Sequence, residues 1–186
     1  MTIYAALLRG INVGGKNIIK MADLKQKFEE MGLTKVKTYI QSGNVLFESD
    51  EEEVSLQNRL EHEIEATFGI TVPVILRTAD EIKKVANNCP FSKEEISAAE
   101  ATAEGESLYV SFLAQNPSLE GIEKLSIFKS PSEEYRVEGR DVYLLFGHSI
   151  RNSKLANNLQ KIDVSVTTRN WKTINKLVAL ITEMEH

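Results

Sequence analysis

The predicted secondary structure elements occur in the same order twice along the chain, and this repetition limits the possible folds more than any other feature. The first half predicts strand, helix, strand, strand, helix and strand over residues 3–8, 22–31, 36–41, 45–48, 50–68 and 72–76. The second half predicts the same six elements over residues 108–113, 119–128, 134–138, 142–146, 153–161 and 164–167, with a closing helix from about Asn170. Such a recurrence indicates a duplicated fold.

Two consecutive βαββαβ units predict an α+β protein made of two ferredoxin-like halves. We expect the first half at 1–78, a helical and polar connector at 79–106, and the second half with its C-terminal helix at 107–186. The strand at 3–8 is apolar at odd and even positions alike, which predicts a strand covered on both faces. We therefore expect the two halves to pack together as one compact body.

Glycines stand at the turn of each predicted hairpin. Gly43 separates the strands at 36–41 and 45–48, and Gly139 has the same place in the second half. Glycine permits the positive φ of a tight hairpin turn. Ser42 and Asn44 flank the first of these glycines, and the turn alone is a sufficient explanation for both residues.

The helix at 50–68 has a predicted cap and a predicted buried face. Ser49 can cap it, and the acidic residues 50–53 in its first turn match the positive end of the helix dipole. The predicted buried stripe consists of Val54, Leu60, Ile64 and Phe68.

Charge is distributed unevenly along the chain. The net charge is -5 overall, but residues 1–44 carry net +4 and residues 148–176 carry net +5, which leaves -14 on the remainder. The overall negative charge argues against a general nucleic-acid coat protein. If the two basic ends meet in space, they form a positive patch suited to an anionic partner.

The segment RGINVGGKN, residues 9–17, resembles a phosphate-binding loop. It has the G-x-x-x-x-G-K spacing, but Asn17 stands where a Ser or Thr hydroxyl would hold magnesium. Residues 18–20 also separate it from the next helix, so a nucleoside triphosphatase site is not predicted. Weaker anion binding by backbone N–H groups beside Arg9 and Lys16 is the remaining functional reading. The alternative is that the glycines serve only a tight connection.

A second polar and cationic segment, TTRNWKT at residues 167–173, lies where the last strand meets the last helix. Unpaired helix N–H groups point outward at such a junction, so this segment is a second candidate anion site. The alternative is that Asn170 or Thr168 caps the helix while Trp171 packs against the core.

Four segments, ALLRGINVGGKN, MADL, YIQSGNVLF and TRNWKTINKL, are similar to motifs of the uncharacterised bacterial domain-of-unknown-function family 1697. The resemblance spans nearly the whole chain. It implies a duplicated ferredoxin-like architecture and no established activity. Cys89 replaces the Asn of the family's Asn-Pro-Phe motif, which argues against a nucleophilic role for this thiol. The motif segments hold the candidate ligand-binding residues, which are Arg9, Asn12, Gly14, Gly15, Lys16, Asn17, Ser42, Asn44, Thr168, Arg169, Asn170 and Trp171.

Other chemistry has little support in the sequence. The histidines at 62, 148 and 186 lack the spacing of metal ligands, so neither a metal nor a cofactor is expected. The three motif segments that hold the candidate ligand-binding residues contain no acidic or His side chain that could act as a general base, so catalysis is not predicted, although it is left open. A single cysteine, no signal-like start and no apolar run of membrane length predict a soluble protein of the cytoplasm.

The leading hypothesis is therefore a cytosolic protein that binds a small anionic ligand, such as a nucleotide or phosphorylated metabolite. We expect Arg9, Lys16 and Arg169 to hold this ligand between the two halves. A nucleic acid bound along the same basic patch is the first alternative. A non-enzymatic interaction module, in which all motif residues serve turns and caps, is the second. No membrane partner is expected, and the oligomeric state is left open.

Overall fold

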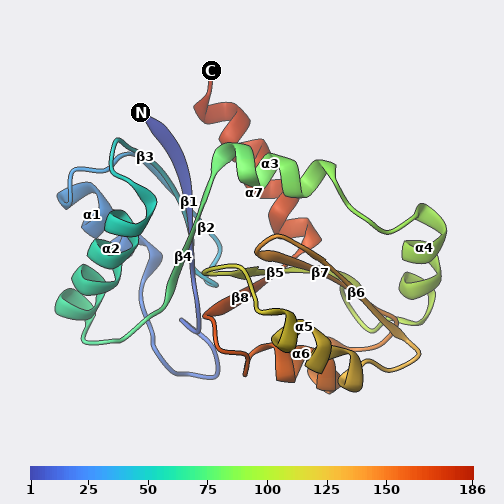
Figure 1. Cartoon of the computed structure of the whole chain (residues 1–186). Coiled ribbons are helices and arrows are strands. Elements are labelled where there is room, and N and C mark those ends of the chain that lie inside the picture. The colour runs from blue at the N-terminus through green and yellow to red at the C-terminus, as the bar shows by residue number, and fades with distance from the viewer. The chain divides into compact units, whose positions relative to one another are not determined.

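The computed structural model describes all residues 1–186 and contains two four-stranded antiparallel sheets and seven α-helices (Figure 1). The chain divides into two compact units. The first unit comprises Met1–Val85 and Lys176–His186, and the second comprises Ala86–Asn175. None of the helices combines the length and the apolar character needed to cross a lipid bilayer.

The sheet of the first unit has the strand order β2-β3-β1-β4. Its elements are β1 (Thr2–Leu8), α1 (Met21–Glu30), β2 (Thr34–Tyr39), β3 (Asn44–Ser49), α2 (Glu53–Phe68), β4 (Val74–Thr78) and most of α3 (Ala79–Asn87). Helices α1 and α2 lie together on one face of this sheet (Figure 1). The core beneath them contains Phe28 of α1, Phe47 of β3 and Leu60 of α2, each fully buried. In this core the apolar face of the sheet packs against the apolar faces of α1 and α2, as the sequence pattern predicts.

Helix α2 differs in two details from its sequence-based prediction. Val54 is 68% exposed, so its predicted place in the buried stripe is wrong. The buried stripe is instead Leu56, Leu60 and Ile64, which follow a spacing of four that Val54 does not share. Ser49 does not cap the helix, because α2 begins only at Glu53. The Ser49 hydroxyl accepts a hydrogen bond from the Glu51 backbone N–H instead.

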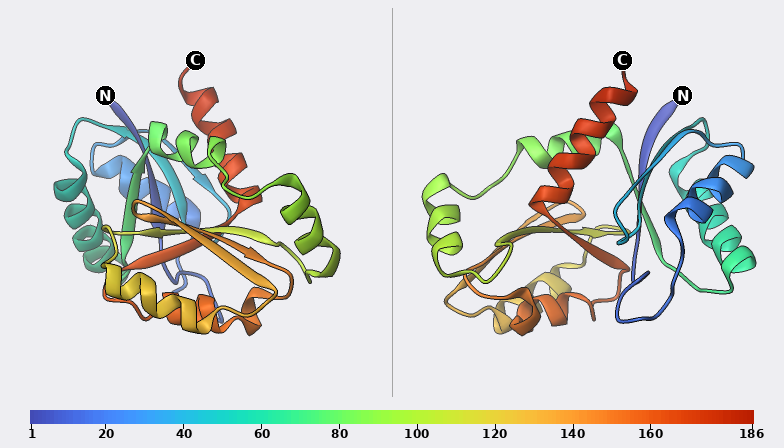
Figure 2. Two further views of the ribbon diagram at one scale, coloured as in Figure 1. Left: turned by 45° about the vertical axis from the view of Figure 1, so that its right-hand side comes forward. Right: turned by 180° about the vertical axis from the view of Figure 1, so that it is seen from behind.

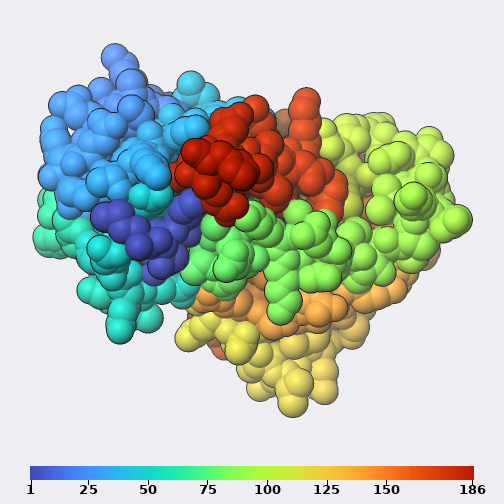
Figure 3. Space-filling view, turned by 90° about the horizontal axis from the view of Figure 1, so that it is seen from above, coloured from blue at the N-terminus to red at the C-terminus, as the bar shows by residue number.

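The other face of the first sheet is reached by the end of the last helix, α7 (Trp171–Met184). Glu183 forms an ion pair with Lys37 of β2. Lys37 is paired with Leu46 of β3, whose neighbours Val45 and Phe47 point into the core under α1 and α2. Lys37 and Leu46 therefore lie on the opposite face of the sheet. Glu185, just after α7, pairs with Lys83 of α3, and the two segments lie side by side in Figure 3.

The sheet of the second unit has the order β6-β7-β5-β8. The elements of this unit are α4 (Lys93–Thr102), β5 (Leu108–Leu113), α5 (Leu119–Leu125), a 3-10 turn at Ser126–Phe128, β6 (Glu133–Glu138), β7 (Asp141–Phe146), a second 3-10 turn at Ile150–Asn152, α6 (Lys154–Leu159) and β8 (Val166–Asn170). Helices α5 and α6 lie together on one face of the sheet (Figure 2). Leu125, Phe146 and Leu155 are buried in the core on that face.

The two halves share more than the order of their elements, which confirms the predicted repetition. The Leu8 N–H donates to the Gly43 carbonyl at 2.9 Å, and in the second half the Leu113 N–H donates to the Arg140 carbonyl at the same distance. Gly43 and Gly139 both have positive φ, at 90° and 62°. The central strands are also buried on both faces, as predicted, since every residue from Tyr4 to Leu8 is at most 6% exposed.

Two buried tyrosines and one half-buried tyrosine make the stability of this fold sensitive to alkaline pH. Burial is the main cause that raises the pKa of Tyr4, Tyr109 and Tyr143 above the ordinary value of 10.0. As the pH rises, these tyrosines therefore lose their protons in the unfolded chain first, and the folded chain binds more protons. The free energy of unfolding must then fall above pH 10.0, so the stability that these groups contribute is present below that pH and lost above it.

We predict that Tyr143→Phe makes this alkaline loss of stability smaller. Tyr143 is 2% exposed, and the Asp141 carboxylate adds to the effect of burial on its pKa. Urea unfolding of both proteins between about pH 9 and about pH 11 measures the difference, because Phe cannot ionise. Equal slopes for the two proteins would show that Tyr143 ionises alike in the folded and unfolded chains.

Candidate functional site

The loop between β1 and α1, residues 9–20, contains a small β-hairpin. It leaves the end of the first sheet that is remote from the N-terminus (Figure 2). The Asn12 N–H donates to the Asn17 carbonyl at 3.0 Å, and the Lys16 N–H donates to the Val13 carbonyl at 3.1 Å. The two residues at the tip, Gly14 and Gly15, have φ of 59° and 73°, the pattern of a type I′ turn. We call residues 12–17 the glycine hairpin.

The side chain of Asn12 fixes the glycine hairpin to the rest of the unit. Its Nδ2 donates to the carbonyls of Ile19 at 3.0 Å and Gln41 at 2.8 Å. Its Oδ1 accepts from the Ile19 N–H at 2.8 Å. Asn12 has a φ of 55°, a left-handed conformation that asparagine tolerates better than most residues. One side chain thus joins both ends of the loop to the turn between β2 and β3.

The turn between β2 and β3 packs closely under this loop. A Cβ placed on Gly43 would lie 2.8 Å from Cδ1 of Ile11 and 2.9 Å from Cβ of Leu8, so only glycine fits there. Asn44 is fully buried, and its Nδ2 donates to the Tyr39 carbonyl at 3.0 Å and to the Ser42 hydroxyl at 3.1 Å. These bonds support the reading of Ser42 and Asn44 as turn residues.

The polar groups that the loop leaves for a partner are cations and amides. Lys16 and Lys20 are exposed and Arg9 is half-buried, and none of the three has an ion-pair partner in the protein. The backbone N–H groups of Gly14 and Gly15 donate to no protein acceptor. Donors of this kind, beside unpaired positive charge, suit a phosphate or carboxylate group.

Three exposed apolar side chains flank the residues that are joined by the hydrogen bonds of the Asn12 side chain. Val13 and Ile18 are each 63% exposed, and Ile40 is 48% exposed. They are the sequence neighbours of Asn12, Ile19 and Gln41, the three residues that the Asn12 side chain links together. Ile40 has a φ of 49°, which is strained for a β-branched residue. Strain of this sort is found most often at functional sites.

The hairpin geometry differs from that of a triphosphatase loop. In those proteins the loop leads into a helix whose free N–H groups face the phosphates. Here Lys16 lies on the second strand of a hairpin, and α1 begins only at Met21. The similarity of spacing at Gly10, Gly15 and Lys16 therefore does not extend to the backbone.

The carboxy-terminal candidate segment lies in the second unit and is largely occupied by its own contacts. Arg169 is 7% exposed, and its Nη1 donates to the Thr167 hydroxyl at 2.7 Å and to the Thr168 carbonyl at 3.1 Å. Burial lowers the pKa of Arg169 to about 10. Asn170 caps α7, because its Oδ1 accepts from the Thr173 N–H at 2.8 Å. This bond supports the capping alternative for Asn170.

The other residues of this segment also have partners within the second unit. The Thr168 hydroxyl lies 2.7 Å from the Ser111 hydroxyl across the β5–β8 pair. The Trp171 ring packs against the Tyr143 ring, with their centroids 6.4 Å apart. The candidate residues thus fall into two sets. Arg9, Asn12, Gly14, Gly15, Lys16 and Asn17 belong to the loop after β1, and Ser42 and the buried Asn44 belong to the β2–β3 turn that is bonded to this loop in the first unit. A common site with the second set stays a prediction.

Sequence reasoning missed a buried arginine in the first unit. Arg77 is 0% exposed and lies in β4 at the position that Arg169 has in β8, fourth in each strand. Each guanidinium donates to the carbonyl of its own preceding residue, at 3.0 Å in Arg77 and 3.1 Å in Arg169. The matching patterns VILRT and VTTRN were the available signal, because a lone charge in an apolar strand is unusual.

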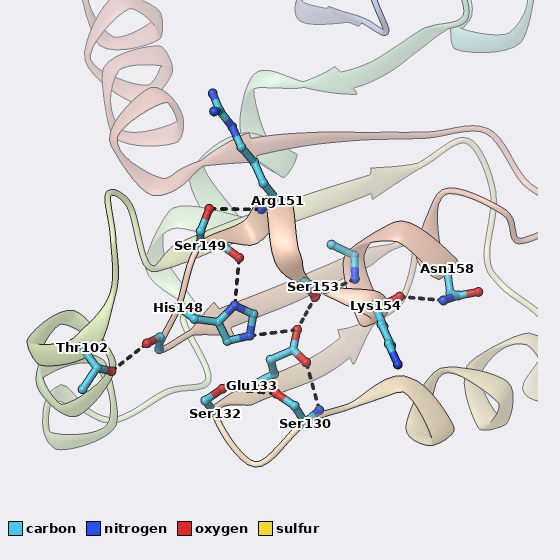
Figure 4. A network of polar contacts seen from close by, with 12 residues as sticks. Thr102, Ser130, Ser132, Glu133, His148, Ser149, Arg151, Ser153, Lys154 and Asn158 are labelled. Atoms are coloured by element: carbon cyan, nitrogen blue, oxygen red, sulfur yellow. Dashed lines mark hydrogen bonds and ion pairs between the residues drawn. The ribbon is translucent and has the colours of Figure 1, made fainter.

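A buried carboxylate network lies in the second unit (Figure 4). Glu133 is 2% exposed, and its carboxylate accepts hydrogen bonds from the Ser153 hydroxyl and, at 2.9 Å, from the Ser130 N–H. Nε2 of His148 lies 3.6 Å from the same carboxylate. The Ser153 hydroxyl also accepts from the Ala156 N–H at 3.0 Å and so caps α6. Since Ser153 is 0% exposed, its hydroxyl is placed for capping and not for attack on a substrate.

No group of three or more His, Cys, Asp or Glu side chains is arranged to hold a metal ion. The free Cys89 is partly buried, with its Sγ 3.9 Å from the Phe91 carbonyl. The glycine hairpin with its cations and the pockets of the second unit are places where a ligand can be accommodated.

The fold and this site define a mixed α+β protein with two similar halves and a glycine hairpin that links β1 to α1. The chain belongs to the family of proteins of unknown function DUF1697, whose model matches residues 1–143. Among solved structures, the chain is similar to the conserved bacterial protein SP0830 from Streptococcus pneumoniae, with 24% identity and a TM-score of 0.77. That likeness covers 98% of this chain and 99% of the other, and it shows the fold. No curated protein matches the chain.

Proposed function

We propose that this protein binds a small phosphate-bearing ligand, of the nucleotide kind, at the glycine hairpin of the first unit. The observation that carries the proposal is the pair of unpaired amides at Gly14 and Gly15, next to the unpaired cation Lys16 and in the same loop as the unpaired Arg9. An anion placed there would receive charge-assisted hydrogen bonds without breaking any bond of the protein.

The fixed position of the hairpin supports the same proposal. The three bonds of the Asn12 side chain hold the loop before a ligand arrives. A preorganised loop loses less conformational entropy on binding, so more of the interaction energy appears as affinity. A flexible glycine tip alone would lack this advantage.

The exposed apolar residues favour a ligand that is more than a phosphate. Val13, Ile18 and Ile40 offer aliphatic surface beside the cations. Covering this surface with the base or sugar of a nucleotide would remove apolar area from water and add affinity. Inorganic phosphate has no group to make these contacts, so we expect it to bind more weakly than a nucleotide.

A fold assignment accompanies this proposal. We infer that each half is a ferredoxin-like βαββαβ unit. The strand orders β2-β3-β1-β4 and β6-β7-β5-β8 support this inference, together with the antiparallel pairing of every neighbouring strand.

Isothermal titration with ATP, pyrophosphate and adenosine tests the binding proposal. We expect ATP to bind most tightly, and the double variant Arg9→Ala with Lys16→Ala to weaken it at least tenfold, as loss of two charged hydrogen-bond donors implies. The matched control is Lys93→Ala with Lys154→Ala, which removes two exposed lysines of the second unit and the same charge.

Three results would overturn the proposal. One is the absence of binding by the unmodified protein to any of the three compounds, and another is an equal loss in the control variant. The third is that the protein binds single-stranded RNA with an affinity that falls steeply as the salt concentration rises, but does not bind nucleotides. That result would instead support the nucleic-acid alternative.

A further inference from the structure

The second unit contains a pocket of about 530 Å³ on its helical side. It lies between the loop that follows β5, helix α5 with the 3-10 turn after it, and the segment that joins α6 to β8. Its lining includes Gln115, Asn116, Lys124, Phe128, Lys161 and Asp163. A pocket of this size is in the range of small-molecule sites.

The pocket is open because the two halves differ in the loop after their first strand. In the first unit this loop spans 9–20 and places Ile11 and Ile19 in the core, at 1% and 2% exposure. In the second unit the corresponding loop is 114–118, which is shorter and buries no side chain. This end of the second core is therefore left uncovered, whereas the first unit covers its own.

The inner wall of the pocket is apolar. Leu125 is buried in the second core, and Phe128, Ile162 and Val164 are half-buried against it. These four side chains keep part of their apolar surface in contact with the pocket. An apolar group of a ligand would gain free energy by covering them.

The mouth of the pocket carries two opposite charges that are not used by the protein. Lys161 and Asp163 line the pocket, and neither has an ion-pair partner, including the other. By contrast, Lys124 is paired with Glu120 at 3.0 Å. The amides of Gln115 and Asn116 add donors and acceptors at the same mouth. The free groups thus suit a ligand with one positive and one negative group.

We propose that this pocket binds a zwitterionic α-amino acid with a large apolar side chain. Lys161 receives the carboxylate, Asp163 receives the ammonium group, and the side chain lies against Phe128 and Ile162. An anion alone would meet the repulsion of Asp163, and a cation alone that of Lys161. This site is separate from the glycine hairpin and does not rest on the function proposed for it.

The test is a titration of the full 15N-labelled chain with L-phenylalanine, followed by amide chemical shifts. We expect saturable amide shifts at Gln115, Asn116 and Ser118 and at residues 161–164. 3-Phenylpropionate, which lacks the ammonium group, and phenethylamine, which lacks the carboxylate, should each bind about tenfold more weakly.

Two variants test the roles of Lys161 and Asp163 separately, because each should remove the preference for L-phenylalanine over a different one of the two analogues. Lys161→Met should abolish the preference for L-phenylalanine over phenethylamine, and Asp163→Asn should abolish its preference over 3-phenylpropionate. Lys154→Met and Glu123→Gln are matched controls, since both residues are exposed and lie outside the pocket lining. Thermal unfolding checks that all four variants are folded.

The proposal fails if L-phenylalanine causes no saturable shift at either segment up to its solubility limit. It also fails if the three compounds bind equally, or if the two pocket variants behave like their controls.

Discussion

Replacing Asn12 by alanine is expected to lower the free energy of unfolding by about 2–4 kcal/mol, because three hydrogen bonds of about 1 kcal/mol each are lost and a left-handed residue becomes alanine. The loop carries the buried Ile11 and Ile19, so the loss reaches the core and is not confined to the surface. Urea unfolding measures this change. Nucleotide binding should be lost as well, because Asn12 is the link that holds the glycine hairpin in place.

Asn12→Asp is the matched variant for this experiment. Aspartate keeps the acceptor for the Ile19 N–H and tolerates positive φ, but it cannot donate to the carbonyls of Ile19 and Gln41. Its second carboxylate oxygen would face these two carbonyl oxygens and be repelled by them, so we expect a loss of stability at least as large as that of the alanine variant. If both variants unfold like the original protein, the Asn12 bonds do not stabilise the loop.

Gly43→Ala should destabilise the protein by about 2–5 kcal/mol, combining the cost of left-handed backbone with overpacking against the core. The added Cβ would lie 2.8 Å from Cδ1 of Ile11 and 2.9 Å from Cβ of Leu8. Cδ1 is the end of the Ile11 side chain, but Ile11 is packed in the core at 1% exposure, and the Leu8 Cβ is attached directly to the backbone. Gly32→Ala is a close control, since Gly32 has a φ of 87° against 90° for Gly43 but nothing within 4 Å of its Cβ position.

The control variant should lose only the backbone contribution, about 1–2 kcal/mol. The difference between the two variants, measured by urea unfolding, then isolates the close packing of the β2–β3 turn under the β1–α1 loop. Equal losses in Gly43→Ala and Gly32→Ala would mean that Ile11 moves aside without cost, and that the two motif segments are not tightly joined.

The two halves have kept one strand order and have diverged in the loop after the first strand. The first unit has a long loop with two buried isoleucines and an exposed glycine hairpin. The second has a short loop and an open pocket at its helical side. A loop that connects two fixed elements can change with little effect on the core, and such loops often carry function. The two units therefore present different surfaces after their first strand, and we propose a different ligand for each.

The repeated element order could be predicted from sequence because apolar periodicity and turn glycines are local signals. Where the prediction failed, the cause was also local. Val54 was assigned to the buried face of α2, yet it lies in the first turn, out of phase with Leu56 and Leu60. Ser49 was assigned as the cap because capping residues are recognised by type, but the helix begins further along, at Glu53.

The candidate site could be predicted only in part, because its key bonds join residues far apart in the sequence. The motif indicated Asn12, Gly14 and Lys16, but not that Asn12 binds the Gln41 carbonyl 29 positions away. The sequence pattern indicates Arg169 as a cation that could hold an anionic ligand, but it does not predict that β8 places this residue at 7% exposure. The burial of a side chain depends on tertiary packing, and tertiary packing cannot be predicted from residue type and spacing alone.

The most direct test of the account is the amide response of Gly14 and Gly15 to ATP in the full 15N-labelled protein. If the glycine hairpin binds phosphate groups, these two amides should show the largest saturable shifts in the spectrum. The shifts should disappear in the variant with Arg9→Ala and Lys16→Ala and persist in the variant with Lys93→Ala and Lys154→Ala. Unchanged Gly14 and Gly15 amides at saturating ATP would contradict the proposed function.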